Sequence, residues 1–454
     1  MDLNGLDAYS MRGTSWRQPV LRILTAALDR VEPAAAIARH VKRAGEVLTV
    51  DGRQYSLRDY RRVFVIGAGK AGAPMARAVS SLLEERLTRG IVIVKEGYGG
   101  KGEPGNIEIL EAGHPQPDER SVLATGKIIE LLEEAREDDL VLGLISGGGS
   151  ALLSAPVAGV GLEDLQELTS DLLKSGANIN EINTLRKHLE QVKGGQLARL
   201  AAPATMIALI LSDVVGSPLD VIASGPTAAD PSTYRDALRV LTRHDLMEKT
   251  EGPILSILQR GAEGQLAETP KPDDPLFERV QNVVVGSNLQ AAEAAVDQAI
   301  REGFNSMLLT TYLQGEARQA GRLLAAILRQ IAESEKPLAR PACLVVGGET
   351  TVTIGGDGLG GRNQEMALGA VQELAGLRRV AMLTFATDGG DGPTDAAGAI
   401  VTGETWQRSL QAKLDPLEFL RRNDSYHFFQ KLGDLLLTGP TLTNVNDLAV
   451  LFAF

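Results

Sequence analysis

Short apolar runs that end in glycine-rich or acidic loops and lead into helical patterns recur along the chain, and this alternation constrains the fold most. Residues 61–79, RRVFVIGAGKAGAPMARAV, combine an apolar run, three glycines and an alanine-rich helical pattern. DLVLGLISGGGSALL (139–153) and TMIALILSDVVG (205–216) repeat the apolar run followed by a polar loop. Continuous apolar strands that alternate with helices predict a mainly parallel sheet covered on both faces. The expected fold is therefore α/β.

The length predicts two domains, because 454 residues exceed the size at which single cores stop growing. We expect an N-terminal Rossmann-like domain over 1–250 and a C-terminal α/β domain with a mixed sheet over 281–454. Residues 251–280, which contain ETPKPDDP, are expected to form a linker or an exposed edge. Residues 16–44 are expected to form a helix pair that is broken near Pro33.

Composition excludes several classes of function. The net charge is −12 and no long basic run occurs, which argues against a nucleic-acid partner. Cys343 is the only cysteine, so an intramolecular disulfide and a cysteine-rich zinc site are excluded; it is expected to be a buried apolar side chain. No apolar stretch is long enough to cross a bilayer and the N-terminus lacks a signal-peptide pattern, so we expect a cytoplasmic protein without a membrane partner.

The first glycine loop has two interpretations. Gly67, Gly69 and Gly72 have the G-x-G-x-x-G spacing of dinucleotide-binding loops, and Glu96 follows where a ribose ligand would stand. Lys70 lies inside the same loop, where its charge suits the neutralisation of a phosphoryl group. The glycines permit a tight turn and close approach of an anion under either interpretation.

The second glycine loop follows another apolar strand. Three consecutive glycines carry an entropic cost that a simple connection does not require, and successive N–H groups can form an anion-binding nest. The residues expected to bind phosphate or carboxylate are Ser146, Gly147, Gly148, Gly149 and Ser150.

Two further features belong to this domain. Asp213 follows a strand, and we weigh a role in proton acceptance or metal binding evenly against a turn or cap. The segment EINTLRKHLEQVKGG carries Arg186, Lys187, His188 and Lys193, and is either a solvated basic face or a clamp for an anionic substrate. Lys193 is our predicted binding residue in it.

The second domain offers its own loops. Glu349 ends a strand, a hairpin-like glycine run follows at 355–361, and Arg362 and Asn363 open a helix, where a guanidinium suits phosphate or carboxylate. Asn288 opens a helix after the strand in NVVVGSNLQ and is a predicted binding residue.

Acidic and polar residues close the domain. Asp388 and Asp391 are candidate magnesium ligands, although a turn rich in Gly and Asp explains the same sequence nearly as well. A last polar turn contains Thr438, Asn444, Asn446 and Asp447.

Eight motifs together resemble glycerate 2-kinases of the MOFRL type, the two-domain DUF4147/MOFRL family. They are GAGKAG, GHPQPDERS, ISGGGSALL, INTLRKHLEQVKGGQLA, LSDVVGSPLDVIASGPT, GGETTVTIGGDGLGGRNQEMAL, ATDGGDGPTDAAGAIV and GDLLLTGPTLTNVNDLAV. The resemblance covers the chain from about residue 20 to its end. Two positions depart from the family pattern: Ser217 replaces an expected acid, and Leu442 replaces an expected glycine that would permit a positive φ.

The resemblance implies an active site between two α/β domains, where ATP, with Mg²⁺ or another divalent cation, phosphorylates the 2-hydroxyl of D-glycerate. It implies catalytic roles for Lys70 and Arg362, to which we add Asp213. The alternative is a nicotinamide-dependent hydroxypyruvate reductase, which requires a general acid such as histidine near the hydride site. A non-enzymatic sugar-acid binding module comes third, and a homodimer remains open.

Overall fold

The computed structural model describes residues 3, 6, 8–100, 102, 104–250 and 252–454. It contains two compact units. The central unit is Ala36–Val285, and the terminal unit combines Met1–Ala35 with Gly286–Phe454. Within the described ranges, no helix is both long and apolar enough to cross a membrane.

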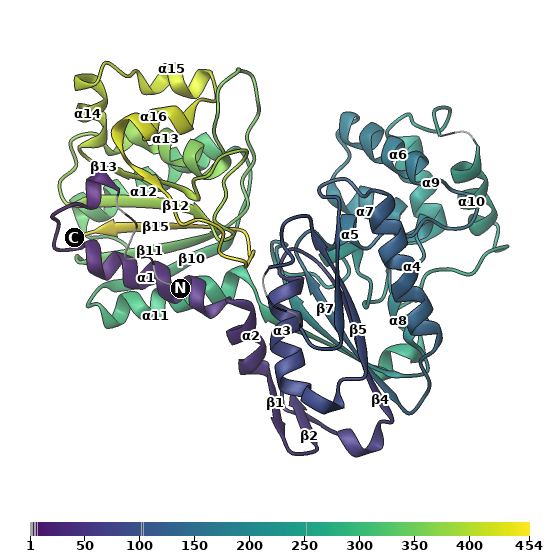
Figure 1. Cartoon of the computed structure of the whole chain (residues 1–454). Helices are drawn as coiled ribbons and strands as arrows, with labels where there is room; N and C mark the ends of the chain where they lie inside the picture. The colour runs from purple at the N-terminus through teal and green to yellow at the C-terminus, as the bar shows by residue number, and fades with distance from the viewer. Residues whose placement is uncertain (1–2, 4–5, 7, 101, 103, 251) are drawn as a thin grey trace. The chain divides into compact units, whose positions relative to one another are not determined.

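The central unit is built on a six-stranded sheet with the order β6-β5-β4-β7-β8-β9 (Figure 1). Its strands are β4 (Arg62–Ala68), β5 (Arg89–Lys95), β6 (Ile107–Ala112), β7 (Asp139–Ser146), β8 (Thr205–Leu211) and β9 (Val280–Gly286). Strands β4 to β8 pair in parallel. The order reverses between β4 and β7, and in open α/β sheets of this order ligands bind at the carboxyl ends of the strands beside that point. The predicted Rossmann-like sheet is confirmed.

Helices cover both faces of this sheet. Helices α4 (Glu119–Glu133) and α8 (Gln196–Ala201) pack on the face that carries Phe64, Ile66 and Ile93, and α3 (Gly72–Leu83) lies on the other side in Figure 1. A separate helical cluster contains α6 (Leu162–Lys174), α7 (Ile179–Leu189), α9 (Tyr234–Arg243) and α10 (Pro253–Ala262). The short helix α5 (Gly149–Leu152) follows β7.

The terminal unit contains the predicted mixed sheet, with the order β10-β11-β15-β12-β13-β14. Its strands are β10 (Asn305–Leu313), β11 (Ala342–Gly348), β12 (Val380–Ala386), β13 (Gly398–Thr402), β14 (Leu435–Leu436) and β15 (Asp447–Ala453). Of the neighbouring strand pairs in the described part of this unit, only β10 and β11 are parallel. Strand β15 is antiparallel to both β11 and β12.

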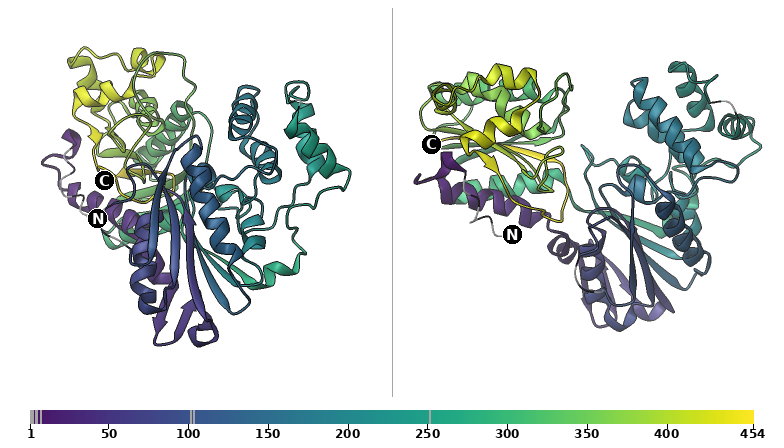
Figure 2. Two further views of the ribbon diagram at one scale, coloured as in Figure 1. Left: turned by 45° about the vertical axis from the view of Figure 1, so that its right-hand side comes forward. Right: turned by 45° about the horizontal axis from the view of Figure 1, so that its top comes forward.

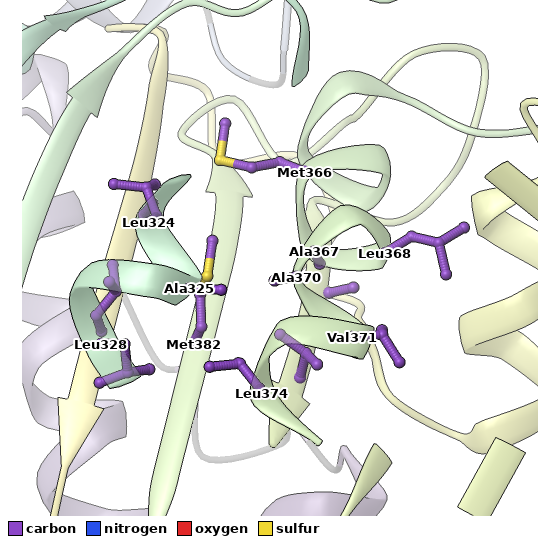
Figure 3. Close-up of a cluster of buried hydrophobic side chains, with 14 of the residues drawn as sticks. Leu324, Ala325, Leu328, Met366, Ala367, Leu368, Ala370, Val371, Leu374 and Met382 are labelled. Carbon is purple, nitrogen blue, oxygen red and sulfur yellow. The ribbon is translucent and has the colours of Figure 1, made fainter. Parts of the chain in front are cut away.

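Two helical layers sandwich this sheet, as Figures 1 and 2 show from several sides. Helices α1 (Arg17–Arg30) and α11 (Asn288–Arg301) lie on one face, and α12 (Ala317–Ser334) and α13 (Arg362–Leu374) on the other. Figure 3 shows Leu324 and Leu328 of α12 converging with Met382 of β12 and Leu374 of α13. Three shorter helices complete the unit: α14 (Thr405–Gln411), α15 (Pro416–Arg421) and α16 (Ser425–Leu432).

The expected domain boundaries differ from the observed units at both ends. Residues 1–35 belong with the C-terminal half, because α1 packs along α11 and Trp16 stacks on Phe454 with ring centroids 4.7 Å apart. Residues 252–285 belong to the central unit, because β9 is an edge strand of its sheet. This segment also contains α10, so it is not a linker; Glu251, the first residue of the expected linker, lies outside the described residues.

The N-terminal helix pair is only partly as predicted. Helix α1 ends at Arg30 and α2 (Pro33–His40) follows, so the break near Pro33 is confirmed. Residues 41–44, expected to be helical, instead form β1 (Val41–Ala44) of a small antiparallel sheet with β2 (Val47–Val50) and β3 (Arg53–Ser56).

Cys343 lies in β11 and is fully buried, as predicted. Burial disfavours the thiolate and raises the pKa of the Cys343 thiol to about 12. The thiol is therefore a packing group, because the reactive species of cysteine is the thiolate.

Candidate active site

The two glycine loops of the central unit lie against each other, because they follow the neighbouring strands β4 and β7. The Lys70 N–H donates to the Gly147 carbonyl at 2.8 Å, and the Ala71 N–H donates to Ser146 Oγ at 3.1 Å. Gly69 has φ of +139°, and a Cβ there would lie 2.1 Å from Ser146 Oγ. Glycine is thus required at this position for the two loops to touch.

The first loop has no spare backbone donors at its centre. The N–H groups of residues 69–72 donate to Ile93 O, Gly147 O, Ser146 Oγ and Gly69 O, in that order. Gly67 allows close packing instead, since a Cβ there would lie 2.5 Å from Leu144 O. Gly67 and Gly69 therefore serve loop packing. Of the groups of this loop that were predicted to bind an anion, the Lys70 side chain remains.

The second loop has the opposite property. In the described part of the chain, no acceptor receives a hydrogen bond from the N–H groups of residues 147–150. Gly148 has φ of +82°, in the left-handed region that glycine adopts without strain. Four successive unused donors are the backbone property that an anion nest requires, in line with the prediction for Ser146–Ser150.

His114 lies beside the second loop, a position that we did not predict. A Cβ on Gly148 would lie 2.9 Å from the His114 ring and 3.6 Å from Lys70 Cγ, so both side chains flank this glycine. Burial, together with the charges of Lys70 and Lys95, lowers the pKa of His114 to about 4. The imidazole is therefore neutral near pH 7. The motif GHPQPDERS contains this residue, but its position beside Gly148 follows only from the tertiary structure.

A strained segment borders the other side of the second loop. Ala223, Ser224 and Gly225 have φ of +50°, +62° and +65°, and two of them are not glycine. Ser224 Oγ lies 2.7 Å from Ser150 Oγ and donates to Asn183 Oδ1 of α7 at 2.9 Å. Strain of this kind is concentrated at functional sites in proteins. Asn183 and Ser224 are thus site residues that our reading of the sequence missed.

Lys193 occupies a different environment from the one expected. Its side chain is buried, and its ammonium forms an ion pair with Glu190. Burial lowers the pKa of Lys193 to about 8, although Glu190 partly opposes this effect. Glu190 also accepts a hydrogen bond from Ser154 Oγ at 2.7 Å. Lys193 therefore holds the structure behind α5 and does not present its charge to a ligand.

Asp213 follows β8, the neighbour of β7 on the far side from β4, and is half-buried. It thus lies at the same edge of the sheet as both glycine loops. Its role as a proton acceptor remains a prediction.

In the terminal unit, Arg362 lies within a carboxylate cluster. Its Nε and Nη2 donate to the two oxygens of Asp447 at 2.6 and 3.1 Å, and its Nη1 donates to Glu349 Oε1 at 2.8 Å. Asp447 begins β15 opposite Gly348 of β11 and Ala386 of β12, which explains why these groups meet.

The carboxylates outweigh the cost of burying Arg362. Burial disfavours its charged form, but Asp447 and Glu349 raise its pKa above the usual value. The Asp447 carboxyl has a raised pKa because of burial, which the charge of Arg362 opposes. Since a guanidinium has five N–H donors and the described carboxylates use three, two donors remain for a ligand. Asp447 was only one member of the polar turn noted in the sequence, and its pairing with Arg362 was not predicted.

Asp391 caps the start of helix α13. Its Oδ1 accepts from the Asn363 N–H at 3.0 Å and its Oδ2 from the Gln364 N–H at 2.8 Å. Burial raises the pKa of this carboxyl to about 7, and the backbone hydrogen bonds oppose the shift. Asn363 itself is fully buried, so the helix end expected to bind phosphate is already occupied by Asp391.

The described residues contain no group of three or more His, Cys, Asp or Glu side chains arranged to hold a metal ion. Asp388 remains half-buried in the turn after β12, where its Oδ1 accepts from the Gly390 N–H at 3.1 Å. The role of Asp388 and Asp391 as magnesium ligands stays a prediction, and the hydrogen bonds of Asp391 to the start of α13 weaken it for that residue.

Two other expectations for the terminal unit change. Asn288 donates from Nδ2 to the carbonyls of Val445 and Asp447, at 2.9 Å each, so it supports the strand that carries Asp447. The glycine run 355–361 is not a hairpin. It packs against residues 422–425, and Asn423 Oδ1 accepts from the Gly355 and Gly356 N–H groups at 2.9 and 3.0 Å.

A cavity of about 800 Å³ in the terminal unit lies at the opposite edge of the sheet, where β12 begins and β15 ends. Its lining includes Trp16, Arg379 and Phe454. It does not include Arg362, Glu349 or Asp447 and is therefore separate from the carboxylate cluster.

Comparison with known proteins gives matches over both units. Residues 19–259 match a family model described as a domain of unknown function (DUF4147), and residues 342–447 match the MOFRL family. A glycerate 2-kinase of Pyrococcus horikoshii is 44% identical over 96% of each chain, and a D-glycerate 2-kinase of Thermotoga maritima is 46% identical over 86% of this chain and 90% of its own.

Two further matches complete the comparison. A putative hydroxypyruvate reductase of Agrobacterium vitis is 41% identical over 96% of this chain and 94% of its own. The crystal structure of a glycerate kinase of Thermotoga maritima matches with a TM-score of 0.85 at 41% identity, covering 97% of this chain and 100% of that chain.

Proposed function

The chain belongs to the glycerate 2-kinase family of the MOFRL type, and from this premise we propose that it transfers the γ-phosphoryl group of ATP to the 2-hydroxyl of D-glycerate. The products are 2-phospho-D-glycerate and ADP. The observation that carries the proposal is the 44% identity to a glycerate 2-kinase across 96% of both chains.

The residues of the central unit suit this reaction. Phosphoryl transfer depends on positioning and charge neutralisation more than on covalent participation of the protein. The unused N–H groups of residues 147–150 are donors for phosphate oxygens, and Lys70 supplies a positive charge beside them. The 2-hydroxyl oxygen attacks the γ-phosphorus as the bond to the β,γ-bridging oxygen breaks, and Asp213 is our candidate acceptor of the hydroxyl proton.

A divalent cation is part of the proposal as the companion of ATP. Magnesium is usually held by one or two carboxylates together with phosphates and water, so it does not need a preformed protein cage. The side chains described do not form a metal site, and the roles of Lys70 and Arg362 are therefore assigned without one. A cytoplasmic location and a homodimer stay predictions.

The reductase alternative has weaker support in the geometry. The N–H groups of residues 69–72 are already used, and Glu96, the expected ribose ligand, pairs with Arg120 at 2.9 Å. His114 is near the second loop, but its lowered pKa leaves little protonated imidazole to act as a general acid at neutral pH.

The direct test mixes purified protein with ATP, MgCl₂ and D-glycerate and follows ADP. Phosphorus NMR then separates 2-phosphoglycerate from 3-phosphoglycerate. We expect ADP formation that requires D-glycerate, is lost on chelation of the metal, and yields the 2-phosphate. Oxidation of NADH with hydroxypyruvate, without glycerate-dependent ADP, would establish the reductase instead.

Variants of Lys70 and Arg362 test the proposed charge stabilisation. Removal of one such donor typically lowers kcat by about 10²- to 10³-fold, which we expect for Lys70→Ala. For Arg362 we choose Arg362→Lys, because alanine would leave the buried Asp447 carboxylate unpaired. Lysine keeps the charge but loses the planar fork, and kcat should fall with the fold intact.

Matched controls are available on the surface of each unit. Lys127 of α4 pairs with Glu108 of β6, and Arg322 of α12 pairs with Glu373 of α13. Lys127→Ala and Arg322→Ala should leave kcat within about twofold, since surface substitutions usually have small effects. A Lys70→Ala or Arg362→Lys variant that keeps wild-type kcat would remove that residue from the chemistry.

A further inference from the structure

Arg186 of α7 is a half-buried cation whose guanidinium has no hydrogen-bond or ion-pair partner among the described residues. Within the described residues it forms no hydrogen bond and no ion pair, in contrast to the other cations of the same basic stretch. Lys187 contacts Asp230 at 3.2 Å and Asp220 at 3.4 Å, and Lys193 pairs with Glu190. Placing a charge away from water without a partner is costly, so an unpaired Arg186 requires an explanation.

The helix places Arg186 beside the second glycine loop. Asn183 stands three residues before Arg186 in α7, and side chains with this spacing share one helix face. Glu190 lies just past the end of the helix and is near enough to Arg186 to affect its pKa. Asn183 contacts Ser224, which lies 2.7 Å from Ser150 of the loop. Glu190 contacts Ser154 and the Ala155 N–H, just after α5. Asn183, through Ser224, and Glu190 therefore place this end of α7 beside the segment that follows β7.

Glu190 compensates the charge of Arg186 only in part. One of its oxygens is paired with Lys193, and the other accepts from Ser154 Oγ at 2.7 Å and the Ala155 N–H at 3.3 Å. Burial lowers the pKa of Arg186, and Glu190 only partly opposes this. An anionic ligand would supply the missing counter-charge, and guanidinium groups bind planar or tetrahedral oxyanions through two parallel hydrogen bonds.

We propose that Arg186 binds a small oxyanion group of a substrate beside the 147–150 loop. This deepens the kinase function proposed above and rests on it. Two groups share the required chemistry: the carboxylate of the acceptor acid and a phosphate of the nucleotide. Lys193, the basic residue expected from the sequence to bind the anion, instead supports this face from behind through Glu190.

The experiment uses the full chain in three variants. Arg186→Met removes the charge and keeps an unbranched stem, and Arg186→Lys keeps the charge and loses the fork. Arg199→Met is the control, because Arg199 is also half-buried in the central unit but donates to Gln196 and to the Glu268 carbonyl. Calorimetry measures the Kd of D-glycerate, ADP and inorganic phosphate separately, and steady-state kinetics measure kcat and KM for D-glycerate, glycerol and ATP.

Loss of a hydrogen-bonded charge pair weakens binding by roughly 10- to 100-fold. If Arg186 binds the acceptor, Arg186→Met raises the Kd and KM of D-glycerate by this factor and leaves those of the nucleotide unchanged. The ratio of kcat/KM for D-glycerate to kcat/KM for glycerol, which has no carboxylate, also decreases. If it binds a phosphate, the nucleotide values change and the glycerate values do not. In either case Arg186→Lys recovers part of the loss.

Unchanged Kd values for all three ligands in folded Arg186→Met, or an equal loss in Arg199→Met, would overturn the proposal. Phosphate and ADP binding are read without turnover. An inactive wild-type protein would therefore contradict the kinase function, whereas intact anion binding in Arg186→Met would contradict the role of Arg186.

Discussion

At the scale of single residues, His114 links the electrostatics of the candidate site to stability. Its pKa falls from an ordinary 6.5 to about 4, because burial and the nearby Lys70 and Lys95 disfavour the imidazolium. Between these two pH values the unfolded chain binds a proton that the folded chain does not. The free energy of unfolding therefore decreases as the pH falls from 6.5 towards 4 and is unaffected by His114 above 6.5.

We expect His114→Asn to remove this acid sensitivity. At 1.4 kcal/mol for each pKa unit the integrated effect has an upper limit of about 3 kcal/mol, which solvent screening of the half-buried ring reduces. Stability of the wild type and the variant, measured at pH 7.5 and at pH 4.5 by hydrogen exchange of the central unit, should differ less between the two pH values in the variant. Parallel pH profiles for the two proteins would show that His114 titrates normally.

Leu442 shows a local conflict between residue and backbone. Its φ is +61°, a conformation in which a residue other than glycine costs roughly 1–2 kcal/mol, and its side chain is exposed. The glycine expected from the family pattern would relieve this strain and would add some entropy to the unfolded chain. Leu442→Gly should raise the stability of the terminal unit by up to about 1 kcal/mol.

The matched control for Leu442 is alanine, which removes the exposed leucine but keeps the strain. Trp16 and Trp406 are the only tryptophans and both lie in the terminal unit, so tryptophan fluorescence follows the unfolding of that unit. A midpoint for Leu442→Gly at or below that of Leu442→Ala would contradict the strain argument.

At the scale of elements, helix α13 depends on a cap supplied from a distant turn. Asp391 accepts from the first N–H groups of the helix, at Asn363 and Gln364, where the N-cap residue Gly361 has no side chain to do so. Loss of such a cap costs about 1–2 kcal/mol. Asp391→Ala should therefore lower the fluorescence midpoint and speed amide exchange at residues 363–366.

Asp395→Ala is the control for this element, because Asp395 is exposed in the same turn and, within the described residues, accepts a hydrogen bond only from the Tyr426 hydroxyl. Asp395→Ala should change the free energy of unfolding by less than about 0.5 kcal/mol. A shift in the magnesium dependence of ADP formation in Asp391→Ala, with amide exchange at the start of α13 unchanged, would restore Asp391 as a metal ligand.

At the scale of the whole molecule, the two ends of the chain belong to the same unit. Helix α1 packs along α11, Arg22 pairs with Glu302 at 2.6 Å, and Ser10 donates to the buried Asp434 at 2.8 Å. The terminal unit therefore cannot complete its core until both ends of the chain are present. The central unit has a core of its own, in its sheet and in its helical cluster.

Truncation of a buried side chain of α1 should consequently destabilise the terminal unit and leave the central unit unchanged. Leu24 is buried in α1, and Leu→Ala at such sites costs about 2–5 kcal/mol. In Leu24→Ala the midpoint of the unfolding curve followed by tryptophan fluorescence should fall. Amide hydrogen exchange should accelerate in β11 and β15, while the amides of β4 and β7 should exchange as slowly as in the wild type. Leu323→Ala, at an exposed leucine of α12, is the control and should have little effect. Equal loss of protection in both units would show that they unfold together.

Much of the fold and of the candidate site followed from the order of residues along the chain. Apolar runs that alternate with helical patterns predicted two α/β sheets, because strand and helix formation depend on local periodicity. Lys70, Arg362 and the Ser146–Ser150 loop were found because they follow apparent strands, and loops at strand ends gather at one edge of a sheet.

Only the tertiary structure decided which groups remain available to a ligand. Hydrogen bonding and burial depend on neighbours far apart in sequence: Ser146 and Gly147 take the donors of the first loop, Asp391 occupies the start of α13, and Glu190 pairs with Lys193. For the same reason residues 1–35 joined the terminal unit, since the apolar face of α1 has its partner in α11. Local sequence patterns are enough to predict the elements and the candidate chemistry. Long-range pairing, in contrast, leaves the N–H groups of residues 147–150 without acceptors and Arg186 without an ion pair among the described residues.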